Sequence, residues 1–132
     1  FYPWSRPATA YTPPLGTTIN DYFAVYNCKA DGSEPGSCAA TDILPVGSRT
    51  PKGDGRWGQA DLGGSMFEWN LDWYHPYVNP CDNCTNLSSS TGRVLRGGGW
   101  RGTAHVLRAA NRSGPMPDGR YVGIGIRCAR AP

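Results

Sequence analysis

The stretch from residue 58 to residue 74 combines acidic, glycine and aromatic residues at a spacing that suits metal binding. Asp61 and Glu68 supply carboxylates, and the backbone carbonyls of Gly64 and Met66 lie between them in the chain. These oxygens form the ligand set that a hard cation such as Ca²⁺ prefers, so the pattern predicts a calcium turn. The alternative is a glycine-broken turn before an amphipathic strand, with both acids solvated, because a lone motif needs its structural context.

Other residue types that act in catalysis are present without the spacing that a catalytic site needs. The two histidines have no nucleophile and no orienting acid at a recognisable distance, and a G-x-S-x-G turn is absent. Asp61 and Glu68 would suit the paired carboxylates of a hydrolase, but the calcium pattern accounts for both. The sequence therefore predicts no catalytic residues.

Five cysteines in a chain of 132 residues indicate an oxidising compartment. Cys28 and Cys38 enclose a loop rich in glycine and serine that a disulfide would hold closed. Cys81 and Cys84 form a C-x-x-C pair, which also occurs in redox sites and as half of a zinc site. Neither a βαβ pattern nor a second ligand pair accompanies it, so a small structural disulfide is the favoured interpretation. Cys128 is left over.

Short, irregular elements must position these groups, because 18 glycines and 12 prolines interrupt the 132 residues. The sequence predicts strands over 66–73, 93–96 and 122–129 and no helix of ten or more residues. Phe67, Trp69 and Trp73 are expected in the core, behind the calcium turn. Residues 1–20 are expected to run over the surface, with Trp4 and Tyr11 as anchors.

Charge is distributed unevenly along the chain. Residues 1–92 carry five bases and nine acids, whereas residues 93–132 carry eight arginines and a single acid, Asp118. A nucleic-acid surface would need exposed runs of basic residues, and there are none. Because arginine suits bidentate pairing with carboxylates, we expect internal ion pairs with the upstream acids. No apolar run is long enough to span a membrane.

Six sequence blocks follow one another in a recognisable order: 61–69, 72–74, 93–100, 108–112, 117–120 and 125–128. They read D-L-x-G-x-x-x-E-W, D-W-Y, R-V-x-R-G-G-x-W, R-A-A-x-R, P-x-x-R and G-x-R-C. Together they resemble the formylglycine-generating enzyme (sulfatase-modifying factor) family, over about Tyr2 to the C-terminus. Tyr2-Pro3-Trp4 stands in the place of the family's P-W-G, and Pro45-Val46-Gly47-Ser48 in that of its P-V-G-S.

The resemblance implies a C-type-lectin-like fold with structural Ca²⁺: α+β, mostly irregular, with short antiparallel strands, one of them over 107–112. Because the family's helices lie mainly before P-W-G, residues 1–132 are expected to form a single domain that is the C-terminal half of a larger one. The family's terminal cysteine pairs upstream of P-W-G. By this resemblance, Cys128 would bond the N-terminal half of the same domain or another chain.

The family's catalytic residues are a C-x4-C cysteine pair after G-G-x-W that holds copper. Residues 101–107 stand there without a cysteine, and the segment is about three residues too short. Copper is therefore not expected, and His105 within the segment is interpreted as solvated.

Two classes of function follow. The first is a non-catalytic binding or structural module, secreted, extracellular or periplasmic, that recognises a protein or glycan through segments 101–106 and 113–122. Its predicted contacts are Arg101, His105, Arg120 and Tyr121, because arginine and aromatic side chains carry much interface energy. The alternatives are a formylglycine-generating oxidase or a diversified lectin-like ligand-binding protein. Glycosylation at Asn83, Asn86 or Asn111 is left open.

Overall fold

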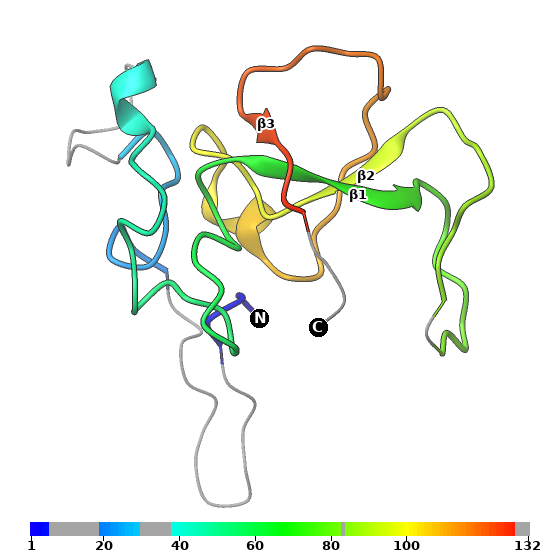
Figure 1. The fold of residues 1–132 in the computed structure, drawn as a ribbon, viewed down its shortest axis with the longest axis horizontal. Helices are drawn as coiled ribbons and strands as arrows, with labels where there is room; N and C mark the ends of the chain where they lie inside the picture. The colour runs from blue at the N-terminus through cyan, green and yellow to red at the C-terminus, as the bar shows by residue number, and fades with distance from the viewer. Residues whose placement is uncertain (6–18, 30–37, 83, 129–132) are drawn as a thin grey trace, which may run out of the picture.

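Turns and irregular backbone form most of this chain, and regular elements are short (Figure 1). The computed structural model describes residues 1–5, 19–29, 38–82 and 84–128. Its elements are the 3-10 turns η1 (Ala40–Asp42) and η2 (Ala104–Leu107) and the strands β1 (Phe67–Trp73), β2 (Arg93–Arg96) and β3 (Ile124–Gly125). The irregular architecture agrees with prediction, but the α part of the α+β class is not found among the described residues.

The strands form one mixed sheet in the order β2-β1-β3. β1 pairs with β2 antiparallel, with Glu68 opposite Arg96 and an irregularity before Trp73. β1 pairs with β3 parallel, with Phe67 opposite Ile124. The prediction of antiparallel strands is therefore corrected for β3. The chain makes a long excursion over residues 97–123 before β3, and a connection of that length allows a strand to return parallel.

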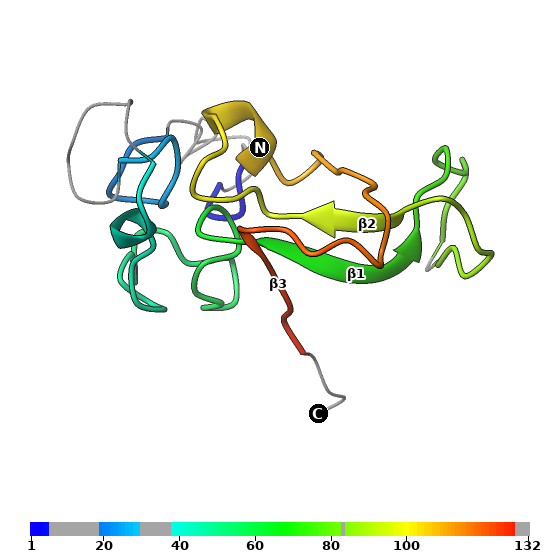
Figure 2. The same ribbon diagram turned by 90° about the horizontal axis from the view of Figure 1, so that it is seen from above.

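Two predicted strands differ from those observed. Residues 107–112 do not form a strand: Leu107 ends η2, and the carbonyls of Ala109 and Asn111 accept hydrogen bonds from the Arg96 guanidinium instead of a neighbouring strand. The predicted strand over 122–129 is reduced to β3, because Gly123, with φ at 95°, turns the chain at its start. Figure 2 shows the chain after β3 leaving the body of the molecule.

The core is built by the N-terminal segment and η2. Tyr2, Trp4, Ala24 and Leu107 form a buried cluster, in which the Tyr2 and Trp4 rings stack with centroids 5.0 Å apart. The prediction that the β1 aromatics lie in the core is wrong, because Phe67, Trp69 and Trp73 are only half-buried. The small sheet has no helical layer against it among the described residues, so its aromatic side chains keep partial contact with solvent.

The glycine run after β2 allows η2 to approach the sheet. Gly97 and Gly98 have φ values of 93° and 74°, a region that favours glycine. A Cβ at Gly98 would lie 2.7 Å from Cδ1 of Leu107. The absence of side chains there therefore allows Leu107 to pack in the core.

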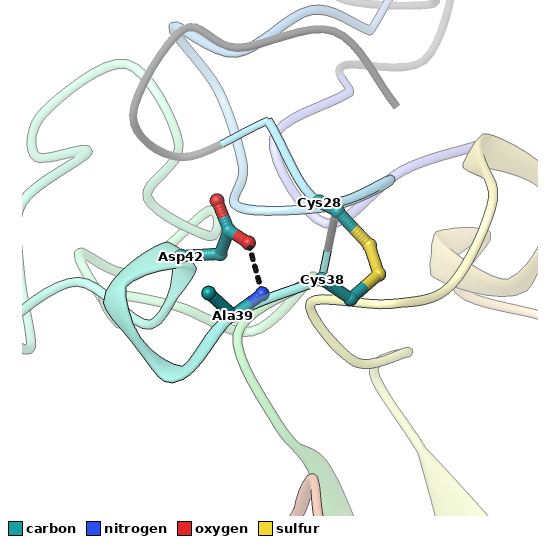
Figure 3. The surroundings of a disulfide bond; sticks show 4 residues. All are labelled: Cys28, Cys38, Ala39 and Asp42. Atoms are coloured by element: carbon teal, nitrogen blue, oxygen red, sulfur yellow. Dashed lines mark hydrogen bonds between the residues drawn. A yellow bond between two sulfur atoms is a disulfide. The ribbon is translucent and has the colours of Figure 1, made fainter. Parts of the chain in front are cut away.

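Two disulfides close loops at opposite parts of the chain. Cys28 bonds Cys38, and Cys81 bonds Cys84, which are the two pairs that the sequence predicted. Figure 3 shows that the first lies beside η1, where the buried Asp42 carboxylate accepts a hydrogen bond from the Ala39 amide at 2.9 Å. Cys128 has an exposed, free thiol.

Several predictions concern residues outside the described part of the chain: the Tyr11 anchor, Asn83, and residue 129 at the end of the predicted last strand. Within the described part, no helical element has the length and apolar character needed to cross a bilayer.

Candidate functional site

A hollow of about 310 Å³ lies between the turn before β1 and the segment after β3, and we call it the acidic hollow. Asp61, Met66 and Glu68, three of the four predicted calcium ligands, line it. The fourth, Gly64, is not among the lining residues. Its backbone packs against the core, since a Cβ there would lie 2.5 Å from the carbonyl oxygen of Val25.

Left-handed backbone in the turn brings the two acids to this hollow. Asp61, Gly64 and Ser65 have φ values of 55°, 87° and 58°. The Asp61 carboxylate accepts a hydrogen bond from the Gly47 amide at 2.7 Å, which ties the turn to the P-V-G-S segment. Residues seven positions apart in the sequence therefore line one surface.

Arg127 also lines the acidic hollow and holds the Glu68 carboxylate. Its Nε donates to both carboxylate oxygens at 2.9 and 3.0 Å, and its Nη2 lies 2.7 Å from Oε1. The same Nη2 donates to the carbonyl oxygen of Asp61 at 3.2 Å. The hydrogen bond to Glu68 is the main cause that raises the pKa of Arg127 above its usual range. The expected pairing of arginine with an upstream acid occurs here.

The ligand types in the acidic hollow suit Ca²⁺, because two acidic residues and Met66 line one space. Only two of the predicted ligands are side chains. In agreement with this, the described residues contain no group of three or more His, Cys, Asp or Glu side chains that could hold a metal ion. Because Arg127 already neutralises Glu68, a bound cation would share or displace the guanidinium. The calcium site stays a prediction.

The second part of segment 101–107, where the resemblance would put the family's cysteine pair, forms the tight turn η2. Leu107 at its end is fully buried, with 0% of its surface exposed. His105 is exposed, and its Nδ1 lies 2.7 Å from the Thr103 hydroxyl oxygen. The segment therefore closes onto the core through an apolar side chain, and it contains no thiol.

The four predicted contact residues are all exposed, but they come from two separate segments. Arg101 lies over the Trp100 ring with its guanidinium carbon 4.5 Å from the centroid, just before the segment of His105. Arg120 and Tyr121 belong to the loop of residues 113–122. Figure 1 shows this loop above β1 and η2 below it, and Figure 2 also shows them apart. Their role in binding stays a prediction.

A second hollow, of about 370 Å³, lies next to η2, and we call it the arginine groove. Its lining residues include three arginines, an exposed tryptophan, two amides and one acid: Arg56, Arg96, Arg108, Trp57, Gln59, Asn70 and Glu68. Pro3 and Leu62 contribute apolar surface, and the buried Leu107 lies behind it. No spacing in the sequence points to this groove, because its residues come from five separate stretches of the chain.

Among the residues that the structure describes, more arginines lie over aromatic rings than are seen paired with acids. Between described residues, the ion pair is that of Arg127 with Glu68. Five other arginines lie over rings at 3.8–5.4 Å: Arg56 on Trp57, Arg93 on Trp73, Arg101 on Trp100, Arg108 on Phe1, and Arg112 on Tyr74 and Tyr77. Between the described residues, the predicted internal ion pairs are therefore replaced in large part by contacts with rings. A planar guanidinium can lie flat on an aromatic face and remain partly hydrated, so the exposed arginines do not need acidic partners.

A third hollow, of about 440 Å³, lies between β1, β2 and the loop that the Cys81–Cys84 disulfide closes. Arg96 and Arg112 line it on one side and Tyr77 on the other. The Arg112 guanidinium carbon lies 3.8 Å from the Tyr77 ring centroid, and Arg96 Nη2 donates to the Tyr77 hydroxyl at 3.1 Å. These contacts fix the loop to the sheet, so this hollow has a structural explanation.

Comparison with protein families places nearly the whole chain in one domain. The model of the sulfatase-modifying factor enzyme 1-like domain matches residues 2–132. Among individual proteins, the chain is 32% identical over 92 residues to the mouse protein named inactive C-alpha-formylglycine-generating enzyme 2, covering 66% of this chain and 26% of that one. It is 30% identical over 79 residues to the serine/threonine-protein kinase pkn1 of Chlamydia pneumoniae, covering 56% of this chain and 13% of the kinase.

Two solved structures share the fold. The Treponema denticola variable protein 1 superposes with a TM-score of 0.62 and 27% identity, covering 80% of this chain and 34% of that one. PvdO from Pseudomonas aeruginosa superposes with a TM-score of 0.66 and 25% identity, covering 85% of this chain and 41% of that one. The chain thus spans between about a tenth and two fifths of the length of these relatives. By its match over residues 2–132, it belongs to the sulfatase-modifying factor enzyme 1-like domain family.

Proposed function

We propose that this domain is a non-catalytic binding module within its family. The observation that carries the proposal is segment 101–107. It has no cysteine where the family's catalytic pair is expected, and it ends in Leu107, which is fully buried. A metal-binding thiolate pair cannot be replaced by an alkyl side chain in the core. The name of the mouse relative, which describes that protein as inactive, supports the same interpretation.

Formylglycine formation is the alternative, and it has a direct test. The full chain is incubated with copper, oxygen and a cysteine-containing sulfatase-motif peptide, and the peptide mass is followed beside a catalytically competent formylglycine-generating enzyme. We expect no change of mass with this chain. Conversion of the cysteine to formylglycine would overturn the proposal.

A diversified lectin-like binding protein is a second form of the same proposal. The relative from Treponema denticola carries the name variable protein, which supports a role for exposed positions in ligand choice. Arg101, His105, Arg120 and Tyr121 remain our candidates for such contacts. Comparison of binding by the Arg101→Ala and Tyr121→Ala variants with that of the unaltered chain would test them. Unchanged binding of a ligand by both variants would exclude these segments as its contact surface.

We also propose a structural Ca²⁺ held by Asp61 and Glu68 and the carbonyls of Gly64 and Met66. Bound calcium would supply positive charge to the two carboxylates and fasten the turn before β1. Titration calorimetry and thermal unfolding in calcium and in EDTA test this. At a calcium concentration of about 100 times Kd, the stabilisation would be roughly 2.7 kcal/mol.

Asp61→Ala, which removes the ligand oxygens, should abolish the calcium response, whereas Asp118→Ala, at an exposed acid outside the acidic hollow, should retain it. An equal response in both variants, or none in the unaltered chain, would contradict the calcium assignment.

The two disulfides favour an oxidising location, which we propose to be extracellular or periplasmic. The exposed thiol of Cys128 is accessible for a disulfide to the N-terminal half of the same domain or to another chain. Non-reducing peptide mapping of the protein isolated from its natural source would show the partner of Cys128. A bond from Cys128 to Cys28 or Cys84 would refute this assignment.

A further inference from the structure

The arginines that line the arginine groove form no ion pair with an acidic residue of its lining. Glu68 is the acidic residue that lines the groove, and Arg127 holds its carboxylate from the acidic hollow. Arg96 is half-buried and donates to backbone carbonyls and to a tyrosine hydroxyl. Arg56 and Arg108 are exposed. Two guanidinium groups therefore face the groove with their charge uncompensated by its walls.

Stacking leaves the donors of these two arginines available. The Arg56 guanidinium carbon lies 5.4 Å from the Trp57 ring centroid, and that of Arg108 lies 4.8 Å from the Phe1 ring centroid. A guanidinium that contacts a ring through its face keeps its in-plane N–H groups free for other acceptors. The planar fork of these N–H groups matches a carboxylate with two parallel hydrogen bonds.

Trp57 is presented to solvent by an ordered turn. It is 79% exposed. The Gly58 amide donates to the Gly55 carbonyl at 2.9 Å, the Gly55 amide donates to the Gln59 carbonyl at 2.8 Å, and the Trp57 amide donates to the Gln59 side chain at 3.3 Å. A large apolar ring held outward by such a turn is a suitable platform for another flat or aromatic group.

The remaining wall of the groove offers an amide acceptor and apolar surface. Asn70 uses its side-chain nitrogen to donate to the Glu68 carbonyl at 3.1 Å, which leaves its amide oxygen to accept a hydrogen bond. Pro3 and Leu62 provide apolar contacts. A backbone N–H would pair with Asn70, and a carboxylate would pair with the arginines. This combination is typical of a peptide that carries acidic and aromatic residues.

We propose that the arginine groove binds an acidic peptide segment in which a carboxylate side chain lies next to an aromatic side chain. This inference rests on the proposed binding function and specifies its ligand class. A hollow of about 370 Å³ is within the range of small-ligand sites, so it accommodates two or three residues of such a segment. Arg56 and Arg108 pair with the carboxylate, and Trp57 stacks with the aromatic ring.

Titration calorimetry with the full chain tests the proposal. The probe is the acetylated tripeptide amide Asp-Phe-Asp, and the neutral comparison is Asn-Phe-Asn. We expect saturable binding of the acidic probe, weakened by added salt because the exposed charges are screened. Arg108→Gln and Trp57→Ala should each weaken it by about tenfold or more, since paired arginines and stacked tryptophans dominate such contacts.

The matched control is Lys52→Gln, which also removes one positive charge. Lys52 is exposed and its Nζ lies 4.8 Å from the Tyr22 ring centroid, but it does not line the groove. It should leave binding unchanged. The fold of every variant is checked by its circular dichroism spectrum and thermal unfolding.

Three results would overturn the inference: no binding of the acidic probe, an equal loss in Lys52→Gln, or equal binding of the neutral tripeptide. Tighter binding of an oligosaccharide of alternating glucuronic acid and N-acetylglucosamine would assign the groove to a glycan and also refute the peptide proposal. These results bear only on the ligand of the groove. The proposed non-catalytic function fails in a different experiment, by turnover of the sulfatase-motif peptide.

Discussion

Glu68 of β1 lines both the acidic hollow and the arginine groove, but the arginines of the two sites have different partners. In the acidic hollow, Arg127 and Glu68 are joined by hydrogen bonds of 2.9 and 3.0 Å, so opposite charges meet. In the arginine groove, Arg56 and Arg108 lie over aromatic rings, and Glu68, the acid among the lining residues, is already paired with Arg127. The first arrangement supports the fold, and the second leaves charge available for a ligand.

This difference explains how one short sheet serves two purposes. The ion pair connects β1 to the segment after β3, which has only two paired residues of its own. Stacked arginines on the groove side add little to the connections between strands. Substitutions on the two sides should therefore separate effects on stability from effects on binding.

Leu107→Ala should have the largest effect, because Leu107 is fully buried beneath the arginine groove and contacts the glycine run after β2. We expect a loss of about 2–5 kcal/mol in the free energy of unfolding, as for other buried leucines. Urea denaturation followed by circular dichroism measures it. Leu71→Ala, at a leucine that is 66% exposed, is the control and should change stability little. Similar losses in the two variants would mean that η2 does not anchor the groove.

Glu68→Gln should have an intermediate effect on stability. The ion pair is partly solvated, with side-chain exposures of 38% for Arg127 and 21% for Glu68, so its contribution is about 0.5–1 kcal/mol. A double-mutant cycle with Arg127→Gln isolates the coupling energy. A coupling energy indistinguishable from zero would remove the distinction between the two sides of the sheet.

Arg108→Gln should change the free energy of unfolding by no more than about 0.5 kcal/mol, because the side chain is exposed and its contact with Phe1 is peripheral. The same denaturation measurement applies. Arg108 thus lies over Phe1 at the surface and, among the described residues, is not seen in one of the internal ion pairs that the sequence predicted. A loss larger than that of Glu68→Gln would restore the structural role and weaken the case for the groove.

Tyr26→Phe should have the smallest effect, and only at alkaline pH. Burial, followed by the negative charge of Asp21 and the neighbouring Tyr2, raises the pKa of Tyr26 above its usual 10.0. The folded state therefore holds the proton more tightly, so the contribution is complete below pH 10.0 and is lost as pH rises through the folded pKa. Between neutral pH and a pH above the folded pKa of Tyr26, the free energy of unfolding should fall less in the variant than in the unaltered chain. Urea denaturation at a series of pH values measures it. If the free energy of unfolding depends on pH in the same way in both proteins, the raised pKa of Tyr26 is contradicted.

The sequence alone determined the features that depend on local chemistry and on the order of the six sequence motifs along the chain. The arrangement of motifs was sufficient to identify the family, and β2 was predicted at its observed bounds. The two disulfides could be predicted because each pair encloses a short loop, where few alternative partners exist. The approach of Asp61 to the hollow of Glu68 also follows from glycines that permit a tight turn.

Tertiary structure decided the features that depend on distant segments. Period-two alternation could not show that β3 pairs parallel to β1 over only two residues, because the pairing depends on where a long excursion returns. Composition could not show that five arginines stack on rings instead of pairing with acids, because both partners suit a guanidinium and only the packed fold selects between them. The arginine groove exists for the same reason: Trp57, Asn70 and Arg108 are brought together by folding and by no spacing in the chain.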